Sequence, residues 1–273
     1  MTKAADTNEK TKTPNSITMP GLNAWNRWLA VLHAAQGIII LLLSTMRVFP
    51  VQTTYLTLDP SASDIAGHPV LASATKHLFD VNLAYLVAAF FFLSAIAHAT
   101  VAWWYRPRYE ADLKRKINKV RWIEYSLSAS VMMVAIAVLS GVADLSTLIA
   151  VFVLDAVMNL MGLAMELYNQ GKAKPNWLVY NVGVLAGIVP WVIFALYVWG
   201  ANIYGSGNIP TFVYWIYLSM FVLFSSFAAN MYLQYKKVGK WSDYLYGERV
   251  YMILSLVAKS LLAWQVFAGT LRP

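Results

Sequence analysis

The stretch SLVAKSLLAW, residues 255–264, contains a single charged residue, Lys259, inside a long apolar segment. The segment runs roughly over 247–270, so Lys259 lies about 12 residues, or about 18 Å of helix, from either end. A lysine stem is too short to carry its ammonium to water over that distance. A charge at the centre of a bilayer costs roughly 3 kcal/mol or more. Lys259 must therefore lose its proton, pair with a carboxylate or be chemically modified.

The composition of the whole chain supports a membrane setting for this segment. Of 273 residues, 59% are hydrophobic and 12% are charged, and a water-soluble domain of this size cannot bury so much apolar surface. The chain contains no cysteine, which excludes disulfides, a thiol nucleophile and cysteine-ligated metals. The net charge of +8 is carried mainly by loops between apolar stretches, so membrane orientation explains it better than nucleic-acid binding does.

Seven stretches are apolar and long enough to form membrane helices, which need about 20 residues each. The first loop, residues 48–77, contains an alternating VQTTYLTL and a turn-rich DPSASDIAGHP, which predict a small β-hairpin outside the membrane. We expect an all-α membrane protein with a polar cytoplasmic arm at 1–24 and one membrane domain at 25–273. The expected spans are 25–47, 78–105, 119–141, 146–169, 176–200, 210–235 and 247–270.

Lysine and arginine are distributed unequally between the two sides of these spans. The N-terminal arm with the start of the first span and the second, fourth and sixth loops together hold 17 of the 21 basic residues. The opposite side holds only Arg47, Lys76 and Arg272. Basic loops stay in the cytoplasm. The sequence therefore predicts a cell-membrane protein with a cytoplasmic N-terminus and, after seven spans, an extracellular C-terminus.

The third span carries one acid, Glu124, which lies about five residues from its cytoplasmic end. Because side chains point back toward the N-terminus of their helix, Lys259 reaches toward the depth of Glu124. His33 and His98 lie at a similar depth, and Ser94 shares a helical face with His98. A structural Lys–Glu pair with two packing histidines is one interpretation. A hydrated pocket that holds or relays a proton is the other.

The fourth span carries Asp155, Asn159 and Glu166. Asn159 follows Asp155 by four residues and shares its face. Glu166 lies near the cytoplasmic end, where a salt bridge with Arg249 is the expected arrangement. Asp155 either lines a pocket or faces the outer headgroups.

Aromatic side chains gather on the last three spans. Trp191 and Phe194 follow Pro190, which is expected to kink its helix. Trp264 lies five residues after Lys259. Flat rings around a lysine in the middle of the membrane suit a long, flat, apolar aldehyde.

With these residues in place, the chain resembles the heliorhodopsins, a family of retinal proteins with seven helices in a rhodopsin-like bundle. The resemblance rests on SLVAKSLLAWQ with Lys259, on RWIEYSLSAS with Glu124, and on His33 and His98. The predicted cytoplasmic N-terminus, which is the reverse of the usual orientation of seven-helix receptors and pumps, agrees with it. The long first loop agrees as well. The family's fold implies a seven-transmembrane-helix bundle with the hairpin outside.

The resemblance implies all-trans retinal as cofactor, bound to Lys259 as a Schiff base, with Glu124 as the counterion. It also implies a light sensor rather than an enzyme, a homodimer assisted by the first loop, and a cytoplasmic signalling partner of unknown identity. The residues expected around the chromophore are Ser255, Ser94, Tyr125, Trp191, Phe194, Trp264 and Asn159. Those expected in a polar cavity are His33, His98, Asn118 and Arg121.

Two positions argue against a proton pump. Related pumps carry a carboxylate four residues before the lysine and a second one eleven residues after the counterion. Here these positions hold Ser255 and Ala135. We therefore expect a slow photocycle that retains its proton.

Three other functions stay open. One is a light-driven pump or channel. Another is a metal site or metalloenzyme built from His33, His98 and Glu124, although no HExxH pattern supports it. The third is a transporter that couples through Glu124 and Lys259, against which the absence of internal repeats argues.

Overall fold

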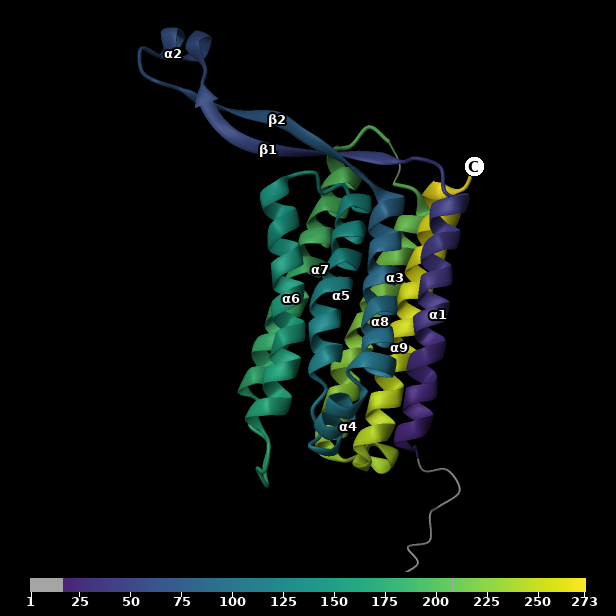
Figure 1. Cartoon of the computed structure of the whole chain (residues 1–273). Coiled ribbons are helices and arrows are strands. Elements are labelled where there is room, and N and C mark those ends of the chain that lie inside the picture. Colours follow the sequence, from purple (N-terminus) through teal and green to yellow (C-terminus); the bar gives the residue numbers. More distant parts are fainter. Residues whose placement is uncertain (1–16, 208) are drawn as a thin grey trace, which may run out of the picture.

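The computed structural model describes residues 17–207 and 209–273, and seven helices in this part are long and apolar enough to cross a membrane (Figure 1). The spans agree with the expected seven in number and order. They are α1 (Met19–Leu43), α3 with its continuation η1 (Leu83–Trp104), α5 (Lys119–Leu139), α6 (Leu145–Tyr168), α7 (Leu178–Tyr204), α8 (Thr211–Lys236) and α9 with η3 (Tyr244–Leu271).

The distribution of side chains is that of a protein whose outer solvent is lipid. Large apolar side chains such as Leu42, Leu185 and Trp104 are exposed on the outside of the bundle. Polar and charged residues such as Ser128 and Lys259 are buried inside it. In a bilayer the backbone N–H and C=O groups of a segment must hydrogen-bond to each other, because no water is present, and this is why the spans are helical. The chain is therefore a multi-pass membrane protein.

The first span begins earlier than the sequence predicts. The side chain of Thr18 accepts a hydrogen bond from the amide of Gly21 at 3.2 Å, and Pro20 lies in the first turn, so α1 begins at Met19. The last six residues of the expected arm, 19–24, are thus helical. Residues 1–16 of that arm lie outside the described residues.

The first loop forms the predicted β-hairpin, which is longer than expected. Strand β1 (Val48–Leu58) pairs antiparallel with β2 (Leu71–Asn82), and the short helix α2 (Pro60–Ala66) lies between them. Residues 78–82, expected at the start of the second span, belong to β2 instead. The span begins only after Asn82, whose side chain caps α3 by accepting from the amide of Ala84 at 2.9 Å.

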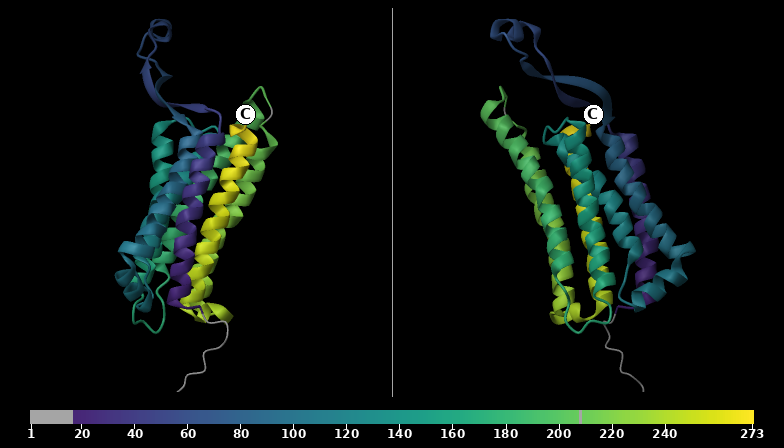
Figure 2. Two further views of the ribbon diagram at one scale, coloured as in Figure 1. Left: turned by 45° about the vertical axis from the view of Figure 1, so that its right-hand side comes forward. Right: turned by 90° about the vertical axis from the view of Figure 1, so that its left-hand side faces the viewer.

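The hairpin lies across one end of the bundle, and its tip extends beyond α6 (Figures 1 and 2). Two backbone amides fix it to the turn before α6: Gln52 donates to the carbonyl of Ala143 at 2.9 Å, and Thr54 donates to Oδ1 of Asp144 at 3.3 Å. The C-terminus lies at this same end. We call it the hairpin end.

The opposite end carries the loops that are rich in lysine and arginine, and we call it the basic end. It includes the start of α1, the short helix α4 (Arg106–Lys114), the loop 169–177 and the turn η2 (Gly239–Ser242) before α9. The main hydrophobic core, which contains Phe90, Met133 and Leu262, involves residues of the hairpin half of several helices. Smaller apolar clusters lie toward the basic end, and the polar interior described next lies alongside them.

Candidate functional site

Lys259 of α9 and Glu124 of α5 meet inside the bundle. Nζ of Lys259 lies 3.3 Å from Oε1 of Glu124 and donates a hydrogen bond to Oγ of Ser255 at 2.8 Å. Oγ of Ser94 on α3 donates to the same oxygen of Glu124 at 2.6 Å. Lys259 is 2% exposed and Glu124 is 8% exposed. Opposite charges at this distance offset much of the cost of burying each one, which explains how the interior tolerates a lysine.

A mainly apolar cavity lies beside Lys259. Three of the residues expected around a chromophore line it: Tyr125, Asn159 and Ser255. The remaining lining residues are Ala129, Met132, Met158, Phe224, Phe227 and Ala258. The buried amine therefore borders a small cavity of about 30 Å³ with mainly apolar walls, and a single carboxylate lies beside the nitrogen.

Trp191 and Phe194 of α7 are buried near this cavity. The ring of Trp191 lies 5.8 Å from that of Phe224, which lines the cavity, and 5.7 Å from that of Phe194. Helix α7 continues through Pro190. These rings extend the apolar wall away from the lysine.

Trp264 does not join these residues. It is 39% exposed on the outside of α9 and packs edge-to-face on Phe267. Five residues correspond to about 500° of helical rotation, so its side chain points well away from that of Lys259. The expectation that Trp264 lies beside the lysine is wrong for this reason.

A polar cavity adjoins Glu124 on the side of the basic end. His98, Asn118, Arg121 and Tyr125 line it, as does Glu124 itself. Three further residues line it that the sequence did not predict: Asn26 on α1, Tyr109 on α4 and Glu248 on α9. Tyr109 lies on α4, where burial raises the pKa of its phenol well above the usual value, so the hydroxyl is a neutral group.

The two histidines stack on each other between α1 and α3. Their ring centroids are 5.6 Å apart with the planes 15° from parallel. Nδ1 of His98 makes a 2.7 Å hydrogen bond with Oδ1 of Asn26. Both ring nitrogens of the buried His33 lack a hydrogen-bond partner within the described part of the chain. His33 therefore offers ring nitrogens that can hydrogen-bond with water beside His98.

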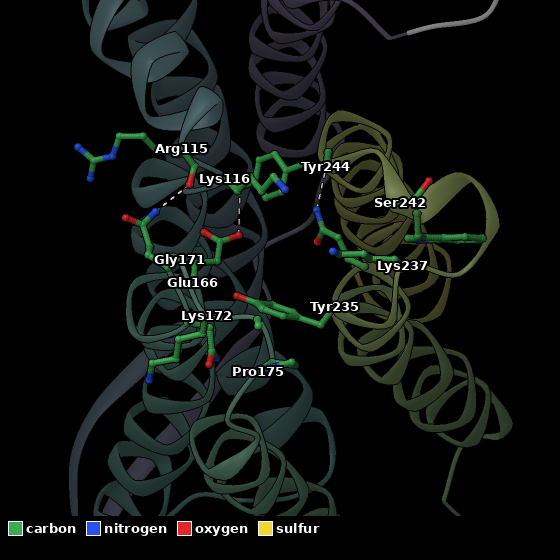
Figure 3. A pocket seen from close by; sticks show the side chains of 15 residues that line it. Arg115, Lys116, Glu166, Gly171, Lys172, Pro175, Tyr235, Lys237, Ser242 and Tyr244 are labelled. Atoms are coloured by element: carbon green, nitrogen blue, oxygen red, sulfur yellow. Dashed lines mark hydrogen bonds between the residues drawn. The ribbon is translucent and has the colours of Figure 1, made fainter.

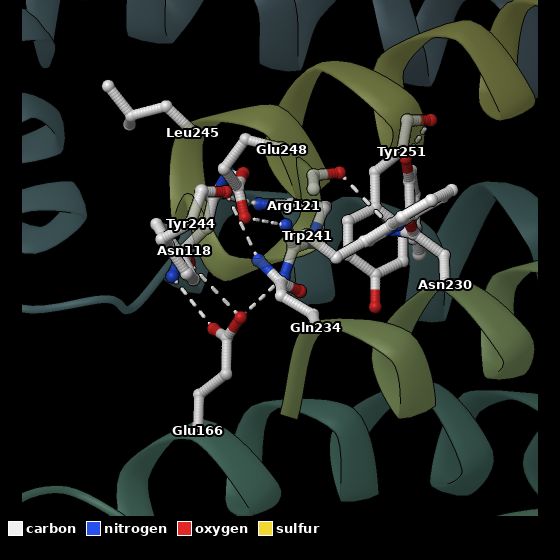
Figure 4. A network of polar contacts seen from close by, with 12 residues as sticks. Asn118, Arg121, Glu166, Asn230, Gln234, Trp241, Tyr244, Leu245, Glu248 and Tyr251 are labelled. Carbon is white, nitrogen blue, oxygen red and sulfur yellow. Dashed lines mark hydrogen bonds and ion pairs between the residues drawn. The ribbon is translucent and has the colours of Figure 1, made fainter. Parts of the chain in front are cut away.

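Arg121 anchors a buried ion cluster between this cavity and the basic end (Figure 4). Its Nη2 lies 2.6 Å from Oε1 of Glu166 on α6, and its Nη1 contacts Oε1 of Glu248 on α9. Asn118 donates its backbone amide to Glu166 at 2.8 Å and its side-chain amide to Glu248 at 2.7 Å. The guanidinium group also stacks against Tyr251, 4.0 Å from the ring centroid. One cation thus links three helices and separates the inner cavity from the outside.

The expected pairing of Glu166 with Arg249 is wrong. Glu166 is 4% exposed and faces the interior, where Arg121 is its partner. Arg249 points outward, and its guanidinium lies 5.4 Å from the ring of Trp25. The two arginines are at the same end of the protein, but only Arg121 lies on a helical face that is turned inward.

Asp155 lines the interior rather than facing headgroups. It is 1% exposed, and its Oδ2 accepts hydrogen bonds from Ser130 at 3.2 Å and from Asn159 at 3.1 Å. The expected sharing of a face by Asp155 and Asn159 is confirmed. The described residues contain no group of three or more His, Asp or Glu side chains arranged to hold a metal ion. The two histidines with Glu124 thus do not form such a group.

Comparison with known proteins agrees with this geometry. The model of a family described as Heliorhodopsin matches residues 22–271, which is nearly the whole chain. No curated protein sequence matches it.

Proposed function

The chain belongs to the heliorhodopsin family, and on this basis we propose that it senses light through retinal bound to Lys259, with Glu124 as the counterion. Membership makes the chain a retinal-binding, light-sensing rhodopsin of the membrane. The residue roles, the all-trans form of the bound retinal and a slow, non-pumping photocycle are our proposal. The observation that carries it is the 3.3 Å contact between Lys259 and Glu124 beside a cavity lined by apolar and aromatic side chains.

Lys259 is the attachment point in this proposal. Its primary amine attacks an aldehyde carbon, a carbon–nitrogen double bond forms and one water molecule leaves. The buried position excludes water, which protects such a bond from hydrolysis. Attachment also makes the lysine stem continuous with an apolar group and leaves the nitrogen with one proton, whose charge Glu124 balances.

Glu124 keeps the proton on the Lys259 nitrogen. A carboxylate 3.3 Å away in a medium of low dielectric stabilises the positive charge strongly. The hydrogen bond from Ser94 fixes the orientation of the carboxylate. Bound retinal supplies absorption of visible light and isomerisation. A displacement of the nitrogen relative to Glu124 then alters the proton affinity of both groups, which is the local change that a sensor needs.

The polar cavity next to Glu124 serves as the place where a displaced proton stays. His98 and Asn26 line this cavity, His33 stacks on His98, and the Arg121 cluster lies between the cavity and the basic end. Ser255 and Ala135 occupy the two positions at which related pumps carry carboxylates. We therefore propose that the proton returns to the nitrogen, which gives a slow cycle without net transport.

The arrangement in the membrane follows from the charges. Because the basic end holds most lysines and arginines, we place it in the cytoplasm and the hairpin outside. The exposed hairpin is then available for pairing with a second copy, and the basic end for a cytoplasmic signalling partner.

Reconstitution with retinal tests the central assignment. Purified protein mixed with all-trans retinal should gain a visible absorption band that hydroxylamine bleaches. Lys259→Ala should lose the band, whereas Lys236→Ala, which removes an exposed lysine at the end of α8, should keep it. A band retained by Lys259→Ala would contradict the assignment, and sustained photocurrents in patch-clamp recordings would contradict the non-pumping part.

A further inference from the structure

A third pocket lies at the basic end, outside the Arg121 cluster (Figure 3). It has a volume of about 590 Å³ and lies between the turn after α4, the loop after α6, the end of α8 and the start of α9. Pockets of about 300–1,000 Å³ are typical of small-molecule sites. This one is separate from the cavity beside Lys259, so its function does not depend on the light-sensing proposal.

The pocket carries more positive charge than its surroundings neutralise. Its lining includes the cations Arg115, Lys116, Lys172 and Lys237, but Glu166 is its only acid. Glu166 already pairs with Arg121 and accepts from the amide of Asn118. None of the four cations forms an ion pair with another residue of the described chain. The potential of the pocket therefore favours an anion.

Two of these lysines occupy an unusual backbone conformation. Lys116 has a φ of 62° and Lys237 a φ of 54°, and they are the only non-glycine residues with positive φ in the described part of the chain. Each lies at the end of a helix, and their amides donate to the carbonyls of Leu113 at 2.9 Å and Gln234 at 3.2 Å. Glycine performs this helix-ending role with less strain. Helix termination therefore does not explain why both positions hold lysine.

The lining also contains aromatic rings held in fixed positions. The hydroxyl of Tyr235 donates to the carbonyl of Met165 at 2.9 Å, and Nε1 of Trp241 donates to Oδ1 of Asn230 at 2.7 Å. Figure 3 shows Tyr235 and Lys237 on one side of the pocket and Lys116 and Glu166 on the other, whereas the guanidinium of Arg115 points outward. Aromatic rings beside ammonium groups are suited to a ligand that has both a flat ring and a charged group.

We propose that this pocket binds a nucleoside phosphate, with its phosphate on Lys116 and Lys237 and its base against Tyr235 and Trp241. The ammonium groups supply charge-assisted hydrogen bonds to phosphate oxygens. Inorganic phosphate and the headgroup of an anionic lipid offer the same charge but no ring. The experiment must therefore compare these three sources.

Calorimetric titration of AMP into the purified full-length protein, in an uncharged detergent, tests the proposal. The double variant Lys116→Gly, Lys237→Gly removes both charges and keeps the positive φ angles. It should bind AMP roughly tenfold or more weakly, while its unfolding temperature stays the same or rises. The control, Lys114→Gln with Lys240→Gln, removes the same charge from residues outside the lining and should bind within about twofold of the unchanged protein.

The other outcomes overturn the proposal or one of its parts. Absence of saturable AMP binding, or equal losses in the two double variants, would mean diffuse attraction and no site. Inorganic phosphate binding as tightly as AMP would overturn the role of the rings. In nanodiscs, displacement of AMP by phosphatidylglycerol but not by phosphatidylcholine would identify a lipid headgroup as the occupant and overturn the nucleoside.

Discussion

The lysine inside the bundle and the lysines at its basic end are the same side chain in opposite circumstances. Lys259 is 2% exposed and has a carboxylate 3.3 Å away. Lys116 and Lys237 are exposed and have no ion pair within the described part of the chain. Burial makes a partner obligatory because an unpaired charge costs several kcal/mol in the interior. Exposure removes that requirement and leaves the charge free to attract a ligand.

The largest effect on stability should come from the buried cluster. Arg121→Gln leaves Glu166 and Glu248 close together without a cation, so we expect a loss of about 3–5 kcal/mol in the free energy of unfolding. The control Arg249→Gln removes an outward arginine and should cost less than about 1 kcal/mol. Thermal unfolding followed by circular dichroism compares them. Equal losses in the free energy of unfolding would show that burial does not determine how much an arginine contributes to stability.

A smaller but specific effect should follow at the counterion. Glu124→Gln removes the negative charge beside Lys259 and keeps the shape, so the ground state of the protonated nitrogen loses its stabilisation. We expect the visible band of the retinal-loaded protein to move to longer wavelength when measured at a pH that keeps the nitrogen protonated. The matched control is Asp155→Asn, a buried carboxyl that is not in contact with Nζ of Lys259. A larger shift in that control would remove Glu124 from the counterion role.

The smallest effect should come from one hydrogen bond. Ser94→Ala removes the 2.6 Å donor to Glu124 but leaves the ion pair, so we expect a band shift clearly smaller than that of Glu124→Gln. The cost in stability should be about 1.5–3 kcal/mol, typical of a hydrogen bond to a charged group. Absorption spectra and thermal unfolding of one sample give both quantities. A shift as large as that of Glu124→Gln would mean that Ser94, and not the carboxylate charge, controls the band.

The seven spans could be predicted because membrane insertion depends on a local property, a run of about 20 apolar residues. The meeting of Lys259 and Glu124 could also be predicted, since depth along a helix follows from counting residues. The start of the second span could not, because residues 78–82 (LFDVN) contain three apolar residues and no Gly or Pro that would separate a strand from a helix. The antiparallel pairing of residues 79–82 with residues 48–51 decides the matter, and that pairing is a long-range contact.

The errors at the site have a different cause, which is helix rotation. Depth placed Arg249 near Glu166, but the face of α9 on which Arg249 lies is turned outward. The expected position of Trp264 is wrong for the same reason. Here the helical period of 3.6 residues already predicts that a residue five positions after Lys259 points in another direction. Glu248 precedes Arg249 by one residue, about 100° round the helix, and lies on the inward face, where it contacts Arg121. The positive φ angles of Lys116 and Lys237 could not be predicted, because no sequence rule assigns a positive φ to lysine.

The most direct test of the central claim is chemical. Retinal-loaded protein is reduced with borohydride in the light, digested, and the peptide that contains Lys259 is weighed by mass spectrometry. We expect a mass increase equal to one reduced retinyl group on Lys259 and on no other lysine. An unmodified Lys259 in protein that shows the visible band would contradict the account.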